Sequence, residues 1–151
     1  MDQAHELTQN IIESTIRAIQ ECTPARTEMQ VRLQHCCEAF DAGDDNAELE
    51  GVGEVAARLG EFANFAAHIY EVAEVCCDEA DVARLNDECQ RLSDCLRQLN
   101  DLLQDRDLVA LCDIIRFDLS ECIGDLFNSL DRLVPSLQRS LATLQTPVEQ
   151  T

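Results

Sequence analysis

The chain has 151 residues, which suits a single domain with a substantial core. Hydrophobic residues make up 46% of it and aromatic residues only 4%, so the composition excludes a disordered chain and argues against a β-sheet. The net charge is −19 and all 11 basic residues are arginines, which excludes a Schiff-base or P-loop lysine and argues against nucleic acid or a membrane as a partner.

Apolar residues recur with helical spacing from the beginning of the chain, and the first helix is predicted over residues 3–22. Thr23 and Pro24 follow as an N-cap residue and a proline suited to a first turn, so a second helix is expected over residues 24–42. Pro24 could instead kink one long helix, because the apolar stripe nearly continues across it. Residues 43–46, Gly-Asp-Asp-Asn, are predicted to form a loop.

The next helix is expected to begin at Ala47 or Glu54 and to end at Cys77. The apolar stripe changes phase near residues 78–81, so another helix should begin there with an aspartate as its cap and run to Gln104. This helix has the most regular heptad pattern of the chain: Val82, Leu85, Cys89, Leu92, Leu96, Leu99 and Leu103.

Asp107 is predicted to cap the last helix, which extends to Leu144 with an apolar face wider than a single stripe. Short loops between long helices favour antiparallel neighbours. We therefore predict an all-α protein, an elongated up-and-down antiparallel bundle of four helices, or of five if Pro24 breaks the first. The bundle should comprise residues 1–144 as one domain, with a frayed tail over residues 145–151.

The start of the chain lacks the basic region and the apolar run of a signal peptide, and no window approaches the ~20 apolar residues of a membrane span. We therefore expect a cytoplasmic protein. Its nine cysteines are an odd number, so at least one has no partner within the chain. We interpret them as reduced thiols that pack as small hydrophobic residues.

A thiolate site for copper or zinc is an alternative interpretation of these cysteines. No C-x-x-C knuckle is present, and adjacent cysteines of a helix diverge by about 100°. Core-facing thiolates from different helices could still hold a soft ion. The candidate ligands are Cys36, Cys37, Cys76, Cys77, Cys89, Cys95, Cys112 and Cys122.

His68 suggests a further alternative, because histidine phosphotransfer domains resemble this chain in size, acidity and helix count. Their phosphorylated histidine is followed by lysine and glycine on the same helix. The segment Ala67-His68-Ile69-Tyr70-Glu71 contains the alanine and the histidine but neither the lysine nor the glycine. The resemblance implies at most a phosphorylated His68.

No catalytic or cofactor motif stands out, so we expect a non-enzymatic protein-interaction module without a cofactor: an adaptor, chaperone-like or regulatory bundle. Its acidity favours partners with a basic segment or an amphipathic helix, and a homodimer is also compatible with the pattern. The wide apolar face of the last helix is the predicted contact surface. The residues that widen it there are Leu111, Ile114, Ile123 and Phe127.

Overall fold

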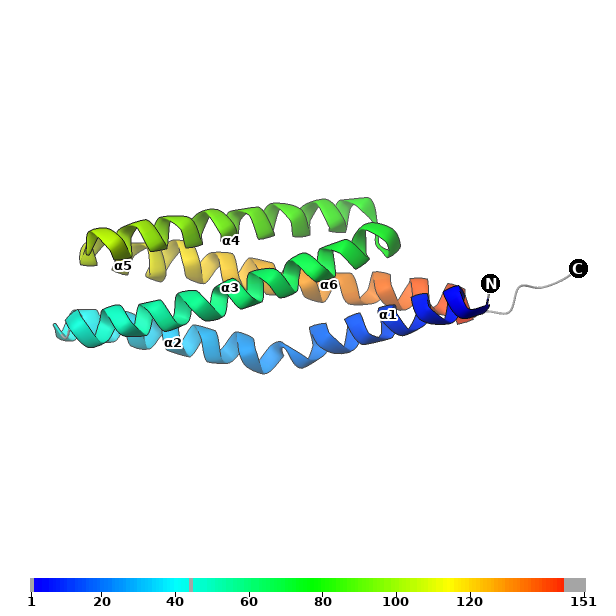
Figure 1. Ribbon diagram of the computed structural model, residues 1–151, viewed down its shortest axis with the longest axis horizontal. Coiled ribbons are helices and arrows are strands. Elements are labelled where there is room, and N and C mark those ends of the chain that lie inside the picture. Colours follow the sequence, from blue (N-terminus) through cyan, green and yellow to red (C-terminus); the bar gives the residue numbers. More distant parts are fainter. Residues whose placement is uncertain (1, 44, 146–151) are drawn as a thin grey trace, which may run out of the picture.

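The structure is a computed structural model of the 151-residue chain, and it describes residues 2–43 and 45–145. Its helices are α1 (Asp2–Glu21), α2 (Thr23–Ala42), α3 (Asp45–Cys76), α4 (Glu79–Asp105), α5 (Leu108–Asp113), the π-helix η1 (Ile114–Leu119) and α6 (Ser120–Gln145). They form four antiparallel rods, since α1 leads into α2 and α5, η1 and α6 are continuous (Figure 1). The predicted all-α, up-and-down, elongated bundle is therefore confirmed.

Pro24 breaks the first rod into two helices, with Cys22 between them. A proline nitrogen cannot donate to the carbonyl four residues earlier, which here belongs to Gln20. The hydroxyl of Thr23 donates to that carbonyl instead, at 3.2 Å, so the break leaves no orphaned acceptor there. The rod bends at this point, and α1 packs mainly against α6 while α2 packs mainly against α3 (Figure 1).

The connections between the rods are short. Gly43 ends α2 in the left-handed conformation, with φ = 83°, and α3 begins at Asp45, inside the loop predicted over residues 43–46. Asp44 and the predicted tail beyond Gln145 lie outside the described residues. The turn between α3 and α4 is bonded to α6, where the hydroxyl oxygen of Ser136 accepts a hydrogen bond from the backbone N–H of Asp78 at 3.2 Å.

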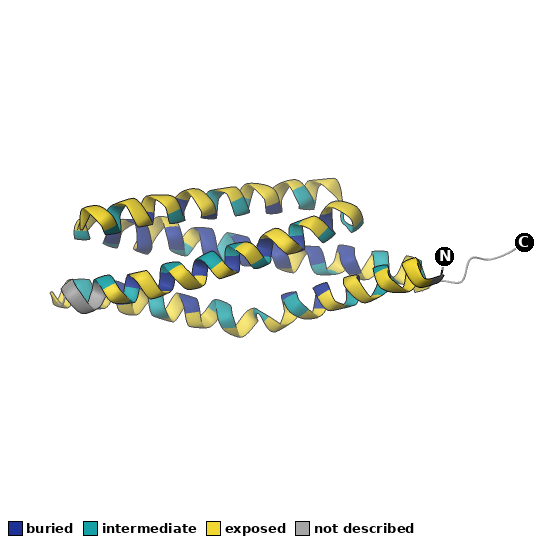
Figure 2. Ribbon diagram, in the orientation of Figure 1, coloured by how far each residue is buried: buried dark blue, intermediate teal, exposed yellow. Residues whose placement is uncertain are grey.

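The core lies along α6, which is buried on more than one side, as the wide apolar face of the sequence indicates (Figure 2). Phe127 is stacked on Phe62 of α3 with ring centroids 4.6 Å apart, and the guanidinium of Arg26 lies 5.6 Å from its centroid. The outer faces of the rods are mostly polar and exposed. None of the described helices has an apolar stretch long enough to cross a membrane.

The last rod contains a π-helix that the sequence pattern did not predict. Asp107 caps α5 as expected, and its carboxylate accepts the N–H of Ala110 at 3.2 Å. In η1 the backbone bonds span five residues instead of four, and the hydroxyl of Ser120 also donates to the carbonyl of Ile115 at 2.9 Å. π-Helices are rare, and those that do occur lie frequently at functional sites. Residues 114–119 are therefore candidates for a functional site.

Candidate functional site

The four predicted contact residues lie in the interior of the bundle. Leu111 and Ile123 are fully buried, Phe127 is 2% exposed, and Ile114 is 6% exposed. The sequence interpretation needs correction here, because the wide apolar stripe of the last helix is covered by the other three rods of the same chain. Only Ile114 also reaches the floor of a surface pocket. A binding surface must therefore be formed by other residues of this region.

An exposed apolar surface does exist where α4, α5 and η1 meet, and we call it the α5–η1 face. Its two outward side chains are Val109 and Phe117, which are 76% and 63% exposed. An open pocket of ≈ 580 Å³ lies beside Phe117, with Leu102 and Ile114 as its other large apolar residues. Val109 lines a smaller neighbouring pocket of ≈ 250 Å³ between α2 and α5, and the two pockets share Asp113. The pocket is lined by Gln98, Asp101, Leu102, Ala110, Asp113, Ile114, Phe117 and Asp118.

The charge of the α5–η1 face is entirely negative. Asp101, Asp113 and Asp118 line the pocket, and no arginine does so. None of the three carboxylates makes an ion pair with a residue that the structure describes. The nearby Arg116 is engaged elsewhere, because its guanidinium donates to Asp41 of α2 at 3.1 Å. The face therefore joins an apolar surface to three carboxylates without a counterion.

The π-helix lets Ile114 and Leu119, which are five residues apart, both face the core. Ile114, Ile115 and Leu119 are all buried, although an α-helix would not place residues five apart on one side. The wider turn keeps these three in the core and leaves residues 116–118 consecutively exposed. Among the described residues, Phe117 is the one phenylalanine in the set of exposed large hydrophobic side chains.

A second apolar hollow runs between α1 and α3, next to the bend at Cys22. Two neighbouring pockets of ≈ 660 Å³ and ≈ 350 Å³ share Ala18 and Phe65 in their linings. Arg58 lines the larger one and is already paired with Glu28 at 2.6 Å. This hollow, the α1–α3 groove, is longer than the α5–η1 face, but its lining mixes both signs of charge.

The predicted thiolate ligands do not converge on one centre. Among residues 2–43 and 45–145, no group of three or more histidine, cysteine, aspartate or glutamate side chains is placed to hold a metal ion. Cys37 of α2 does lie beside Cys112 of α5, and burial, followed by this neighbour, raises the pKa of the Cys37 thiol. Cys36 is buried in α2, Cys76 ends α3, and Cys77 follows it in the turn; Cys89 lies on α4.

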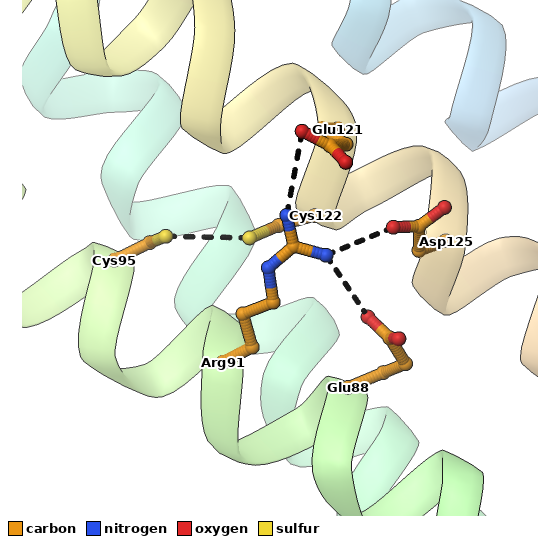
Figure 3. Close-up of polar contacts among 6 residues, drawn as sticks. All are labelled: Glu88, Arg91, Cys95, Glu121, Cys122 and Asp125. Atoms are coloured by element: carbon orange, nitrogen blue, oxygen red, sulfur yellow. Dashed lines mark hydrogen bonds and ion pairs between the residues drawn. The ribbon is translucent and has the colours of Figure 1, made fainter.

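A polar cluster joins α4 to α6 at the middle of the bundle (Figure 3). Arg91 of α4 contacts Asp125 at 2.8 Å and Glu121 at 3.5 Å, both on α6, and Glu88 at 3.6 Å on its own helix. The hydrogen bond that Arg91 donates to Asp125 is the main cause that raises the pKa of Arg91, so the guanidinium stays charged. One buried oxygen of Glu88 has no hydrogen-bond partner, and burial raises the pKa of this carboxyl group.

Beside this cluster, Cys95 of α4 and Cys122 of α6 touch across the helix interface, with their sulfur atoms 3.3 Å apart. Both belong to the cysteines that the sequence suggests as thiolate ligands. Burial is the largest cause that raises the pKa of Cys122, to about 12. This pair and the Cys37–Cys112 pair are the thiol contacts that the structure adds to the sequence interpretation.

His68 projects from the outer side of α3. Its side chain is 80% exposed and lies 3.9 Å from the carboxylate of Glu71, one turn further along the same helix. It also borders the smaller pocket of the α1–α3 groove. The histidine is thus reachable from solvent, and the neighbouring carboxylate of Glu71 would repel a phosphoryl group placed on it.

The structure therefore contains three candidate sites: the acidic α5–η1 face, the α1–α3 groove with charges of both signs, and the buried Cys95–Cys122 pair beside Arg91 and its carboxylates. Phe117 is the residue that sequence reasoning missed, although an aromatic side chain outside the apolar stripe is a signal that the sequence already contains. Comparisons with protein family models, with curated proteins and with solved structures find no match to this chain.

Proposed function

We propose that the chain is a non-enzymatic protein-binding module that docks an amphipathic helix of a partner protein on the α5–η1 face. The observation that carries this proposal is the exposure of Phe117 at an acidic pocket, with Val109 exposed at the neighbouring pocket that shares Asp113. Helix-in-groove recognition needs an apolar surface of this kind, which receives side chains spaced at three and four residues. The π-helix supplies the surface without weakening the core, since its inward residues remain buried.

The charges of the face favour one class of partner. Asp101, Asp113 and Asp118 would receive arginine or lysine side chains from both edges of the docked helix. Charge complementarity of this sort raises the association rate and excludes acidic partners more than it adds affinity. With a net charge of −19, the rest of the chain strengthens the same preference.

Phe117 should supply most of the binding energy. Aromatic residues at the centre of interfaces are the commonest hot spots, and their truncation costs about 2 kcal/mol or more, which is at least about thirtyfold in affinity. Val109 lies at the edge of the same face and should contribute less. Neither side chain is needed by the core, so binding and folding can be tested separately.

The test uses the isotopically labelled full chain and two helical peptides of about 15 residues, a length at which isolated helices begin to form. Both peptides carry leucines at three- and four-residue spacing; one has arginines beside this stripe, and its match has glutamates. We expect amide shifts of residues 98–118 with the arginine peptide alone. Phe117→Ser should weaken binding at least about thirtyfold.

Val75→Ser is the matched control, because Val75 is 83% exposed on α3 and outside the face. It should leave the affinity unchanged. Equal binding of the two peptides would contradict the charge argument. Shifts centred on the α1–α3 groove, or unchanged affinity of the Phe117→Ser variant, would overturn the assignment of the docking surface.

A further inference from the structure

The contact between Cys95 and Cys122 has a chemical consequence that packing alone does not require. Their sulfur atoms are 3.3 Å apart, and the two residues are 8% and 0% exposed. An S–S bond of about 2.05 Å would require each sulfur atom to move by about 0.6 Å. The two side chains come from facing helices, so a bond between them would join α4 covalently to α6 (Figure 3).

Arg91 lies beside the pair and partly offsets the effect of burial on the Cys122 thiol. It lies one turn before Cys95 on α4, and its guanidinium is held against α6 by Asp125 and Glu121. Thiolates, not thiols, are the nucleophiles in sulfur chemistry, and a nearby cation favours them. Burial opposes ionisation of Cys122 and raises its pKa, whereas Arg91 acts in the lowering direction.

We propose that Cys95 and Cys122 form a disulfide when the folded protein meets a small hydroperoxide. A thiol loses its proton, the thiolate attacks one oxygen of hydrogen peroxide, and the O–O bond breaks to give a sulfenic acid and hydroxide. The hydroxide takes up the proton that the thiol released and becomes the first water. The second thiol then attacks the sulfenic sulfur, the S–S bond forms, and a second water leaves. The two cysteines together lose two electrons and two protons, which reduce one peroxide to two waters.

The burial of the pair selects the class of oxidant. A bulky disulfide such as oxidised glutathione cannot reach sulfur atoms that are almost fully covered, whereas hydrogen peroxide is close to water in size. This modification site is independent of the proposed docking function, because neither cysteine belongs to the α5–η1 face. Failure of one proposal therefore leaves the other unaffected.

The experiment treats the reduced, folded full chain with hydrogen peroxide, blocks the remaining thiols and maps the cross-links by mass spectrometry. The sequence suits this assay: cleavage after arginine isolates Cys95 in the peptide 92–97 and Cys122 in the peptide 117–132, each as its sole cysteine. We expect a loss of two hydrogens per chain and a cross-link between these two peptides as the main product.

Two variants separate this pair from general thiol oxidation. Cys95→Ala should abolish the loss of two hydrogens. Cys89 is a partly buried cysteine of the same helix, and the Cys89→Ala variant should lose two hydrogens as the wild type does. The wild-type map decides the matter even if Cys95→Ala fails to fold. A dominant Cys37–Cys112 cross-link, oxygen addition without hydrogen loss, or no reaction of the folded chain would each overturn the proposal.

Discussion

Phe127 and Phe117 belong to the same helical rod, and the structure gives them opposite roles that a stability measurement can separate. Phe127 is 2% exposed, its ring is stacked on Phe62, and the guanidinium of Arg26 lies over that ring. Phe117, by contrast, is 63% exposed. Truncation of a buried phenylalanine to alanine costs about 3–5 kcal/mol. We expect Phe127→Ala to lose that amount and Phe117→Ala to change stability by no more than about 0.5 kcal/mol.

The assay is equilibrium unfolding in urea, followed by far-UV circular dichroism. With an m-value of about 2 kcal/mol/M, a loss of about 4 kcal/mol lowers the midpoint by about 2 M. A chain of this kind has a total stability of about 5–15 kcal/mol, so the Phe127→Ala variant should still fold at low urea. A midpoint shift below about 0.5 M for Phe127→Ala would refute its place in the core. A comparable shift for Phe117→Ala would refute the exposure of the α5–η1 face.

Three further outcomes follow from local features. Asp107→Ala removes the cap of α5 and should cost about 1 kcal/mol in urea unfolding, whereas Asp105→Ala should cost less. Burial, followed by neighbouring carboxylates, raises the folded-state pKa of Glu88 above its ordinary value of 4.5. The free energy of unfolding of the wild type, relative to that of Glu88→Gln, should therefore fall as the pH rises from 4.5 through the raised pKa, as measured by unfolding curves at a series of pH values. Burial raises the pKa of Cys89 to about 11 and of Cys122 to about 12. Labelling of these two cysteines in the folded chain by a thiol reagent should therefore be slow at pH 8 and accelerate as the pH rises, as read by peptide mapping; fast labelling of either one at neutral pH would contradict this.

The sequence predicted the helices well because helical periodicity and capping are local signals. The bend at Pro24 and the cap at Asp107 depend on neighbouring residues alone, and the structure has both. The π-helix escaped prediction because Leu108, Cys112 and Ile115 fit α-helical spacing. Packing against the other rods decides whether an α-turn or a π-turn forms, and the sequence pattern of one helix carries no information about that packing.

The candidate site was harder to predict than the fold. The width of an apolar stripe does not distinguish a face covered by the same chain from one covered by a partner, and Leu111 and Ile123 turned out to belong to the core. Likewise, heptad positions indicate which side of α4 bears Cys95, but they do not fix its height relative to Cys122 on α6. The thiol contact therefore became visible only when the helices were placed against each other.

The wide turn of η1 also has an evolutionary side. A π-turn corresponds to an α-helix that carries one additional residue, so it can arise by a one-codon insertion and vanish by a one-codon deletion. Deletion of Phe117 itself would bring Ile114 and Leu119 to α-helical spacing, so both could stay in the core, while the exposed aromatic side chain would disappear. Relatives of this bundle could thus gain or lose the surface in a single mutational step without rebuilding the fold.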